Sequence, residues 1–252
     1  MKLRFLGTGT STGIPQIGCN CIVCQSSDKR NNRLRASALV SIESSNLLID
    51  CGPDFRAQML NCNSPHLDAL LLTHSHYDHT GGIDDLRPYC KEHDFSIYCK
   101  SDVANDLRNR IPYCFTKNPY PGVPSFAINE LNAIQSFEIN GIKIETLPIL
   151  HYKLEILGFK IGNLAYITDA KTISINTINK IKNIDTLIIN ALRIEEHISH
   201  MSLNQCLDVI KQINPRIAYL THLSHDMGLH EEIERTLPSN VLIAYDNLTI
   251  SI

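Results

Sequence analysis

The chain has 252 residues, more than a typical domain of about 150, so one large domain or two small ones both fit this length. A hydrophobic fraction of 43% and a charged fraction of 19% are typical of globular proteins and exclude disorder over the whole chain. The net charge of −3 argues against a nucleic acid or an anionic membrane as partner, and no apolar run approaches the roughly 20 residues that span a bilayer.

Short apolar runs predict strands along the whole chain. We expect them near Leu3–Leu6, Ala38–Ile42, Leu47–Ile49, Ala69–Leu72, Ser96–Cys99, Ile142–Thr146, Phe159–Ile161, Ala165–Thr168, Leu187–Ile189, Ile217–Leu220, Val241–Ala244 and Leu248–Ile252. Helical patterns lie between them, over Phe55–Leu60, Asp102–Arg110, Ile173–Ile181 and, most clearly, Leu203–Ile213, where Ser202 and Gln205 form a capping box. Strands alternating with helices without a strict βαβ rhythm indicate an α/β (α+β) fold with two sheets and helices outside them.

No change in composition divides the chain, and we predict a single domain over residues 1–252. One segment, residues 111–127, fits neither a strand nor a helix, because prolines in it frame aromatic side chains. It is either a surface loop with its own small apolar cluster, or a lid or dimer contact that reaches over a site.

The strongest motif is a cluster of metal-ligating residue types after the strand predicted at Ala69–Leu72. His74, His76, Asp78 and His79 lie within six residues. In an extended segment the two histidines at positions 74 and 76 point to the same side, and a turn into a helix brings the next two residues toward a second point nearby. Imidazole and carboxylate suit zinc, manganese or iron, and without a cation this cluster would leave unsatisfied nitrogens. The motif therefore predicts a metal site.

The motif His74-x-His76-x-Asp78-His79 resembles the signature of the metallo-β-lactamase superfamily of dinuclear hydrolases. That family has further ligands at later strand ends, and the sequence supplies His151, Asp169 and His222, each after an apolar run. The resemblance implies a four-layer αββα sandwich and two divalent metal ions, manganese or zinc. Carried over residue by residue, it assigns His74, His76 and His151 to one ion, Asp78, His79 and His222 to the other, and Asp169 to a bridge between them.

The aspartate at the bridging position narrows what the resemblance implies. Branches that open β-lactams carry cysteine at this place, so the chain does not resemble a β-lactamase in its chemistry. Asp169 instead makes the chain similar to the phosphodiesterase, nuclease, lactonase and thioesterase branches.

Three of the nine cysteines, Cys19, Cys21 and Cys24, crowd into six residues. The odd total, in a chain that opens without an apolar signal segment, favours reduced thiols in the cytoplasm over disulfides. The spacing fits either a metal site or a group of free thiols, and a tetrahedral zinc site would need a fourth ligand. His225, three residues after His222, is the best candidate.

This region also resembles a particular branch of the superfamily. The opening Gly7-Thr8-Gly9, the cysteine run and Thr221-His222-x-Ser224-His225 are similar to the phosphoribosyl cyclic phosphodiesterases of phosphonate degradation. Relatives of this kind carry a structural zinc on such cysteines plus a histidine. The resemblance therefore implies a structural zinc on Cys19, Cys21, Cys24 and His225.

His200 stands just before the predicted helix cap at Ser202, in a loop of the kind that commonly opens onto a site. We expect it to be the general acid that protonates a leaving alkoxide, and His197 is the competing candidate. The phosphodiesterase resemblance also puts a histidine in this role, in concert with the aspartate that here is Asp78.

A phosphate substrate should meet a fixed cation. Lys29, Arg30, Arg33 and Arg35 form the densest positive stretch, and it is either an exposed polar loop or a phosphate-binding element. Arg33 and Arg35 are our candidates for substrate binding. Arg87 and Arg193 lie near metal-loop elements and are weaker candidates.

Together these expectations describe a metal-dependent phosphodiesterase that cleaves a small cyclic or diester phosphate with a hydroxide that bridges the two metals. The resemblance suggests phosphoribosyl cyclic phosphate as the particular substrate. A tRNA 3′-processing nuclease is an alternative, weakened by the acidic net charge and the lack of a basic arm. Lactonase and thioesterase activities stay open because the same ligands serve acyl transfer. A non-catalytic metal-binding scaffold is disfavoured by the complete ligand set. The expected partner is a small phosphate ester, and a homodimer is expected by family analogy.

Overall fold

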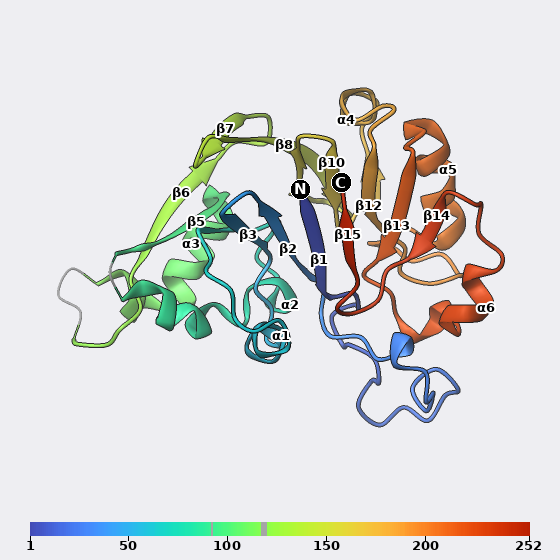
Figure 1. Cartoon of the computed structure of the whole chain (residues 1–252), viewed down its shortest axis with the longest axis horizontal. Coiled ribbons are helices and arrows are strands. Elements are labelled where there is room, and N and C mark those ends of the chain that lie inside the picture. Colours follow the sequence, from blue (N-terminus) through green and yellow to red (C-terminus); the bar gives the residue numbers. More distant parts are fainter. Residues whose placement is uncertain (92, 117–119) are drawn as a thin grey trace.

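The computed structural model describes residues 1–91, 93–116 and 120–252. Two β-sheets lie face to face, and helices cover their outer faces (Figure 1). In these described ranges the first sheet has seven strands, in the spatial order β15 (Thr249–Ser251), β1 (Lys2–Gly7), β2 (Ser37–Ile42), β3 (Ser45–Ile49), β4 (Ala69–Leu71), β5 (Phe95–Lys100) and β6 (Phe126–Leu131).

Within the same described part of the chain, the second sheet has eight strands. Its spatial order is β11 (Thr172–Ile173), β8 (Ile142–His151), β9 (Leu154–Ile161), β10 (Leu164–Ile167), β12 (Thr186–Asn190), β13 (Ile217–Thr221) and β14 (Val241–Ile243), and β7 (Ser136–Ile139) pairs with β8. The strands β10, β12, β13 and β14 run parallel, whereas β8, β9 and β10 form antiparallel hairpins.

Short helices connect the strands. The α-helices are α1 (Phe55–Asn61), α2 (Tyr77–Thr80), α3 (Ser101–Arg110), α4 (Ile175–Lys180), α5 (Leu203–Ile213) and α6 (His230–Glu234), and the 3-10 helices are η1 (Lys29–Asn31), η2 (Ile83–Cys90), η3 (Pro112–Phe115) and η4 (His225–Met227). None of the helices in the described ranges carries an apolar stretch long enough to cross a bilayer.

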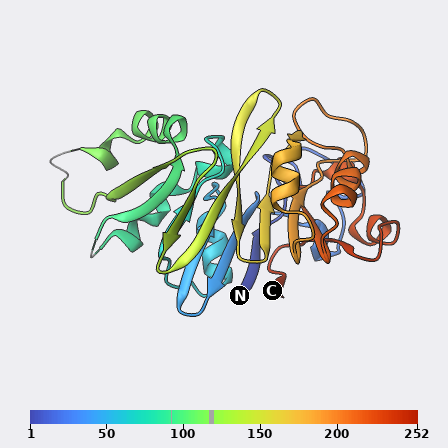
Figure 2. The same cartoon turned by 90° about the horizontal axis from the view of Figure 1, so that it is seen from above.

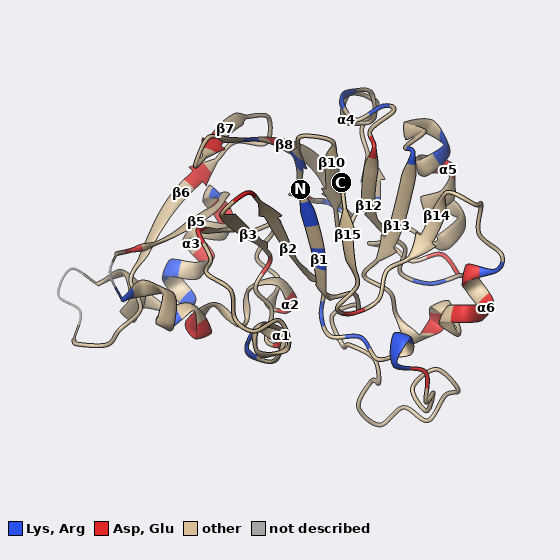
Figure 3. Cartoon of the chain, viewed as in Figure 1, with Lys and Arg blue, Asp and Glu red and all other residues tan. Residues whose placement is uncertain are grey.

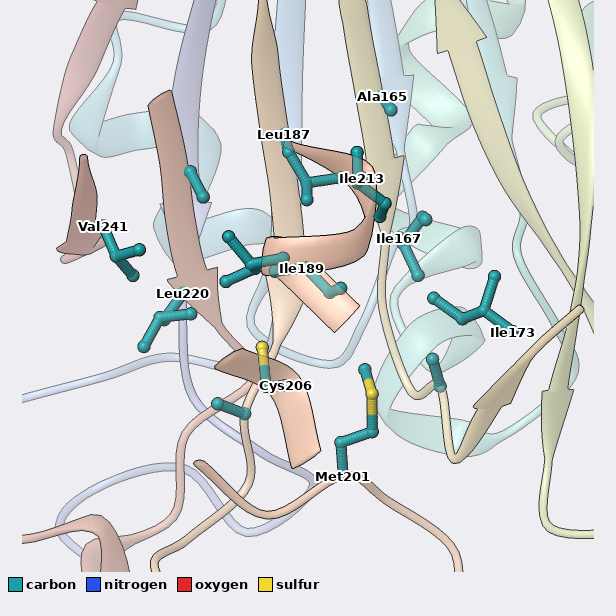
Figure 4. Close-up of a cluster of buried hydrophobic side chains, with 14 of the residues drawn as sticks. Ala165, Ile167, Ile173, Leu187, Ile189, Met201, Cys206, Ile213, Leu220 and Val241 are labelled. Atoms are coloured by element: carbon teal, nitrogen blue, oxygen red, sulfur yellow. The ribbon is translucent and has the colours of Figure 1, made fainter. Parts of the chain in front are cut away.

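The hydrophobic core has three layers that follow from this arrangement. Between the sheets, large side chains from both sheets are buried together, among them Phe5, Leu71, Phe159 and Tyr166. Outside the second sheet, α4 and α5 cover Ile167, Ile189 and Leu220 with Ile178, Cys206 and Ile213 (Figure 4). Outside the first sheet, α1, η2 and α3 cover Leu48, Leu70 and Ile97 with Phe55, Leu86 and Leu107. The predicted helix–sheet–sheet–helix order is confirmed.

The capping box predicted at the start of α5 is present. The Ser202 hydroxyl accepts a hydrogen bond from the Gln205 backbone N–H at 3.4 Å, and the Gln205 side chain accepts one from the Ser202 N–H at 3.2 Å. The helix predicted from Ile173 starts two residues later, because Thr172 and Ile173 pair with β8 as β11.

The segment at residues 111–127 holds η3 and the first residues of β6, and residues 117–119 within it lie outside the described ranges. Two contacts fasten it to η2. The Tyr113 hydroxyl donates to Asp84 at 2.7 Å, and the Arg87 guanidinium donates to the carbonyl oxygen of Gly122. The choice between a lid and a partner contact stays a prediction.

Opposite charges are interspersed over both halves of the molecule, with acidic residues most concentrated on α6 (Figure 3). The two chain ends lie side by side at one edge (Figure 2), where the Met1 amino group donates to the carbonyl oxygen of Ile252 at 3.2 Å.

Candidate metal centre

The centre is built where four strands end. His74 lies three residues after β4, His151 is the last residue of β8, Asp169 lies two residues after β10, and His222 follows β13 directly. The β4 strand belongs to the first sheet and the other three to the second, so the centre sits where both sheets meet. The Leu157 N–H, from β9, donates to the carbonyl oxygen of Thr73 at 3.0 Å and holds the two sheets together here.

The predicted ligands come together in two groups. The ligand atoms of His74, His76 and His151 lie within 4.8 Å of one another, and so do those of Asp78, His79, Asp169 and His222. Asp169 also lies within this distance of His151 and His200. The Asp169 carboxylate is therefore close to ligands of both groups. This is the position that a ligand bridging two cations requires.

Unpartnered nitrogens show that the centre is shaped for cations. His74 Nε2, His79 Nε2 and His222 Nε2 are buried and make no hydrogen bond in the described structure. His79 Nε2 nevertheless lies 3.2 Å from both Asp78 Oδ2 and Asp169 Oδ2, and His222 Nε2 lies 3.2 Å from Asp169 Oδ1. Buried imidazole nitrogens without partners are costly, whereas imidazole and carboxylate donors that converge on one point fit a divalent ion.

Asp50, a residue that our sequence analysis did not single out, orients ligands of both groups. Its fully buried carboxylate accepts hydrogen bonds from His79 Nδ1 at 2.7 Å and from the Thr73 hydroxyl at 2.9 Å. The Thr73 oxygen in turn lies 3.0 Å from His74 Nδ1. With Nδ1 of each ring engaged in this way, Nε2 of His74 and of His79 is left to face the centre.

Backbone strain concentrates at the same place. Asp50, Asp169 and His222 adopt left-handed backbone conformations, with φ of 60°, 56° and 58°. Non-glycine residues take this region at a cost, and they cluster where a site requires a fixed direction of the side chain. Gly52 shows how tightly the loops pack, because a Cβ at this position would overlap the carbonyl oxygen of Asp78.

The charge states of four ligands suit a cation, whereas at His79 the carboxylates of Asp169 and Asp78 outweigh burial and raise the pKa. Burial alone would raise the pKa of Asp78, but the adjacent imidazole of His79 outweighs it and lowers the pKa, so the carboxylate is ionised. Asp169 is likewise held ionised, its pKa lowered by His222 and His79 against the effect of burial. Burial lowers the pKa of His74 and of His76, which leaves these imidazoles neutral and able to donate a lone pair.

The structure brings His200, and not His197, into the cluster. His200 Nδ1 lies 3.7 Å from Asp169 Oδ1, and its ring stacks on that of His222 with centroids 5.0 Å apart. Burial and the neighbouring His222 lower the pKa of His200 to about 3. His197 lies one ring further out, 5.3 Å from His200, and its Nδ1 accepts the Ser199 N–H.

The cysteine loop forms a second group of potential ligands, in the blue segment between β1 and β2 that extends below the body in Figure 1. Cys19, Cys21, Cys24 and His225 offer ligand atoms within 4.8 Å of one another. His225 Nδ1 lies 3.3 Å from the sulfurs of both Cys19 and Cys21. The Cys24 backbone N–H and the His225 side chain lower the pKa of Cys21 to about 6, which favours the thiolate form that binds metal.

The two arginines predicted to bind substrate are engaged elsewhere. Arg33 is 4% exposed, and its guanidinium donates to Thr8 Oγ1 at 2.8 Å and to His230 Nδ1 at 3.1 Å, so the structure corrects its assignment to a buried structural network. Arg35 pairs with Asp54 at 3.0 Å and donates to the carbonyl oxygen of Ser11. The dense positive stretch therefore gives no free cation at the centre from these two residues.

Comparison with known proteins identifies the class. A β-lactamase superfamily domain matches residues 45–223, and the chain belongs to this superfamily of metal-dependent hydrolases. A crystallised diphosphatase of the PhnP family superposes on 100% of this chain and 97% of its own length, with a TM-score of 0.93 and 32% identity. Within the superfamily the chain is therefore a member of the PhnP family, which confirms the resemblance found in the sequence.

Two further proteins are similar over the whole chain. The short form of human tRNase Z has a TM-score of 0.74 at 18% identity, over 100% of this chain and 99% of its own, which shows a shared fold. An octanoyltransferase of Porphyromonas gingivalis is 43% identical over 250 residues, which are 98% of this chain and 51% of that protein. The chain spans about half the length of the curated relatives that it matches.

Proposed function

We propose that the chain is a metal-dependent phosphodiesterase that hydrolyses a small cyclic or diester phosphate. The observation that carries the proposal is the position of Asp169, whose carboxylate lies between the two ligand groups and beside His200. A bridging carboxylate with a histidine next to it suits the transfer of a phosphoryl group to water with protonation of the leaving oxygen. Similarity to a diphosphatase of the PhnP family supports the same chemistry.

Each residue has a distinct task in this proposal. His74, His76 and His151 would hold one divalent ion, Asp78, His79 and His222 the other, and Asp169 would contact both. When bound, the two ions would supply an activated water and offset the negative charge that builds on the phosphoryl oxygens. Asp50 and the carbonyl oxygen of Ser199, which accepts a hydrogen bond from His151 Nδ1 at 2.8 Å, hold the imidazoles in orientation.

His200 would donate the proton to the leaving oxygen. Its pKa of about 3 makes it neutral at pH 7 before substrate binds. An anionic phosphate beside the ring stabilises the imidazolium and raises this pKa, so the substrate itself would charge the acid. His200→Ala should therefore slow hydrolysis of an alkyl phosphodiester by about a hundredfold or more and affect a nitrophenyl ester much less, while His197→Ala serves as the matched control.

The metals and the structural zinc belong to the same proposal. Manganese or zinc would occupy the paired site, and zinc would occupy the group of three cysteines with His225, where thiolate ligands favour it. A small phosphate ester is the proposed partner. Basic and acidic residues alternate along the ribbon in Figure 3 and the net charge is −3, which favours a small substrate over tRNA.

A second candidate function rests on the similarity to the P. gingivalis octanoyltransferase, because 98% of this chain matches one half of that protein. Hydrolysis of an octanoyl thioester would use the same ligands. The test is a panel of bis(p-nitrophenyl) phosphate, 2′,3′-cyclic nucleotide, cyclic ribose phosphate, a lactone and an octanoyl thioester, assayed with metal-free protein to which manganese or zinc is added. Phosphodiesters should give the highest kcat/KM; a preference for the thioester would overturn the first candidate in favour of the second.

A further inference from the structure

A two-residue turn next to the metal centre carries a tyrosine and a lysine. His151 pairs with Leu154, so Tyr152 and Lys153 alone connect β8 to β9 in the hairpin drawn yellow in Figure 2. Tyr152 takes the left-handed region, with φ of 54°. Because Tyr152 is the one residue of this turn with positive φ, the turn favours glycine or asparagine at its first position, where bulky side chains are strained.

Two other hairpins of this protein follow that preference, whereas the β2–β3 turn has Glu43 at the same position. The β7–β8 turn is Asn140-Gly141, with φ of 51° and 77°, and the β9–β10 turn starts with Gly162 at φ of 54°. Four further asparagines in the described ranges hold the same conformation, namely Asn63, Asn183, Asn214 and Asn247. Apart from His222, which belongs to the metal centre, Tyr152 is the one ring-bearing side chain in the described structure with positive φ.

The fold does not use this tyrosine for packing. Its side chain is 49% exposed, and the Lys153 ammonium lies 5.2 Å from the centroid of its ring. The turn follows directly on the ligand His151, whose ring is 5.2 Å from that of His76, the exposed member of the ligand set. The turn is therefore next in sequence to a ligand that contacts the exposed His76, and it carries an exposed aromatic ring and a cation.

We propose that Tyr152 and Lys153 form a recognition lip for the substrate of this centre: Tyr152 stacks on a planar ring, and Lys153 pairs with an anionic group beside that ring. A nucleoside phosphate has a planar base and an anionic phosphate. An aromatic side chain can stack on the base, and an ammonium group can pair with the phosphate. The inference rests on the proposed function and narrows its substrate to a ring-bearing phosphate ester. Backbone strain at Tyr152 is then the consequence of placing the ring at the mouth of the centre.

The test replaces the turn by the sequence that its geometry prefers. Tyr152→Gly with Lys153→Asn gives the β8–β9 hairpin the Gly-Asn sequence of the β9–β10 turn, Gly162-Asn163, in which only the first residue has positive φ. The control applies the same change to the β2–β3 turn, Glu43→Gly with Ser44→Asn, where Glu43 has φ of 53° and lies at the opposite end of β3 from Asp50. Both variants should gain about 2–4 °C in Tm, because both relieve the same strain.

Kinetics separate the two variants. The substrates are thymidine 5′-(p-nitrophenyl phosphate), which carries a planar base, and methyl p-nitrophenyl phosphate, which does not. The wild type should prefer the thymidine ester over the methyl ester, and the control should keep this preference. In the Tyr152–Lys153 variant, the KM for the thymidine ester should rise about tenfold while kcat stays unchanged. Lys153→Gln alone should weaken the dependence of KM on salt concentration.

A binding measurement makes the inference independent of turnover. Calorimetric titration of thymidine 5′-monophosphate should give a Kd about tenfold weaker for the Tyr152–Lys153 variant than for the wild type and the control. If all three proteins show the same preference for the thymidine ester and the same Kd for thymidine 5′-monophosphate, the proposed role of Tyr152 and Lys153 in substrate binding would be overturned. Loss of kcat together with a lower Tm would also overturn it, because the turn would then be structural. If the protein hydrolyses neither ester but the tenfold difference in Kd is found, the proposed function would be refuted. The proposed binding role of Tyr152 and Lys153 would then stand.

Discussion

Asp50 shows how one buried carboxylate organises the centre. It receives hydrogen bonds from His79 directly and from Thr73, whose oxygen contacts His74. Asp50→Asn removes the charge that fixes the His79 tautomer, and metal affinity should fall by about ten- to a hundredfold. Competition with a chromogenic chelator measures this, with the exposed Asp208→Asn as control. Equal affinities in both variants would show that Asp50 does not orient the ligands.

A second residue-scale prediction concerns the buried pair of Arg33 and His230. His230 is 2% exposed, and its Nδ1 accepts a hydrogen bond from Arg33, so burial and this cation lower the pKa of His230 to about 4. A histidine with a depressed folded-state pKa contributes stability above its unfolded pKa of about 6.5, and that stability is lost as the pH falls toward 4. His230→Gln keeps an acceptor but does not titrate.

The free energy of unfolding of the wild type should therefore fall more steeply than that of His230→Gln between pH 6.5 and 4, by at most about 3 kcal/mol. Urea unfolding at several pH values measures the difference between the two proteins. Parallel curves would mean that His230 is already free to take up a proton in the folded state.

Functional residues that belong to a sequence motif could be predicted, whereas single functional residues outside a motif could not. His74 through His79 stand close together in the sequence, and His151, Asp169 and His222 follow apolar runs, so the ligand set emerged from the sequence and its resemblance. Asp50 also follows an apolar run, which is the signal that was available, but no neighbouring ligand type marks it. Arg33 was misassigned because charge alone does not reveal that the side chain is buried against Thr8 and His230.

At the scale of elements, the cysteine loop shows how little regular structure surrounds the second group of ligands. The apolar cluster under it contains only Ile14, Val23 and Cys24 as buried members in the described structure. We therefore expect a loop with so small a core to depend on the proposed zinc for its conformation. Cys21→Ser should therefore lose one zinc per chain and lower the Tm, while the paired site keeps its metals.

Metal analysis by mass spectrometry and thermal unfolding test this prediction, with Cys90→Ser as control because Cys90 lies outside the cluster. An unchanged metal content in Cys21→Ser would remove the structural zinc from the account.

The elements were predictable to different degrees. Apolar strands such as β4 and β13 and the capped helix α5 were predicted because their hydrophobic periodicity is strong. The strands β6 and β7 were not predicted, because they lie at the margins of their sheets and alternate polar with apolar residues over short runs, as Phe126–Leu131 and Ser136–Ile139. Pairing with a neighbour, which no local pattern encodes, makes them strands.

At the scale of the whole molecule, the sandwich brings together ligands of the paired metal site that are up to 148 positions apart, from His74 to His222. Each sheet contributes part of the centre, and the buried layer between the sheets, with Phe5, Phe159 and Tyr166, fixes their relative position. The alternation of strands and helices predicted two sheets, but only the resemblance to a known superfamily predicted which strand ends would meet.

The central claim is that seven side chains of both sheets hold two divalent ions that phosphodiester hydrolysis requires. The most direct measurement is metal stoichiometry together with hydrolysis of bis(p-nitrophenyl) phosphate, for wild type and Asp169→Ala, after exhaustive chelation and after adding manganese or zinc back. We predict that chelation abolishes hydrolysis, that two equivalents restore it in the wild type, and that Asp169→Ala fails to recover it. Hydrolysis that survives chelation, or that Asp169→Ala recovers in full, would contradict the claim.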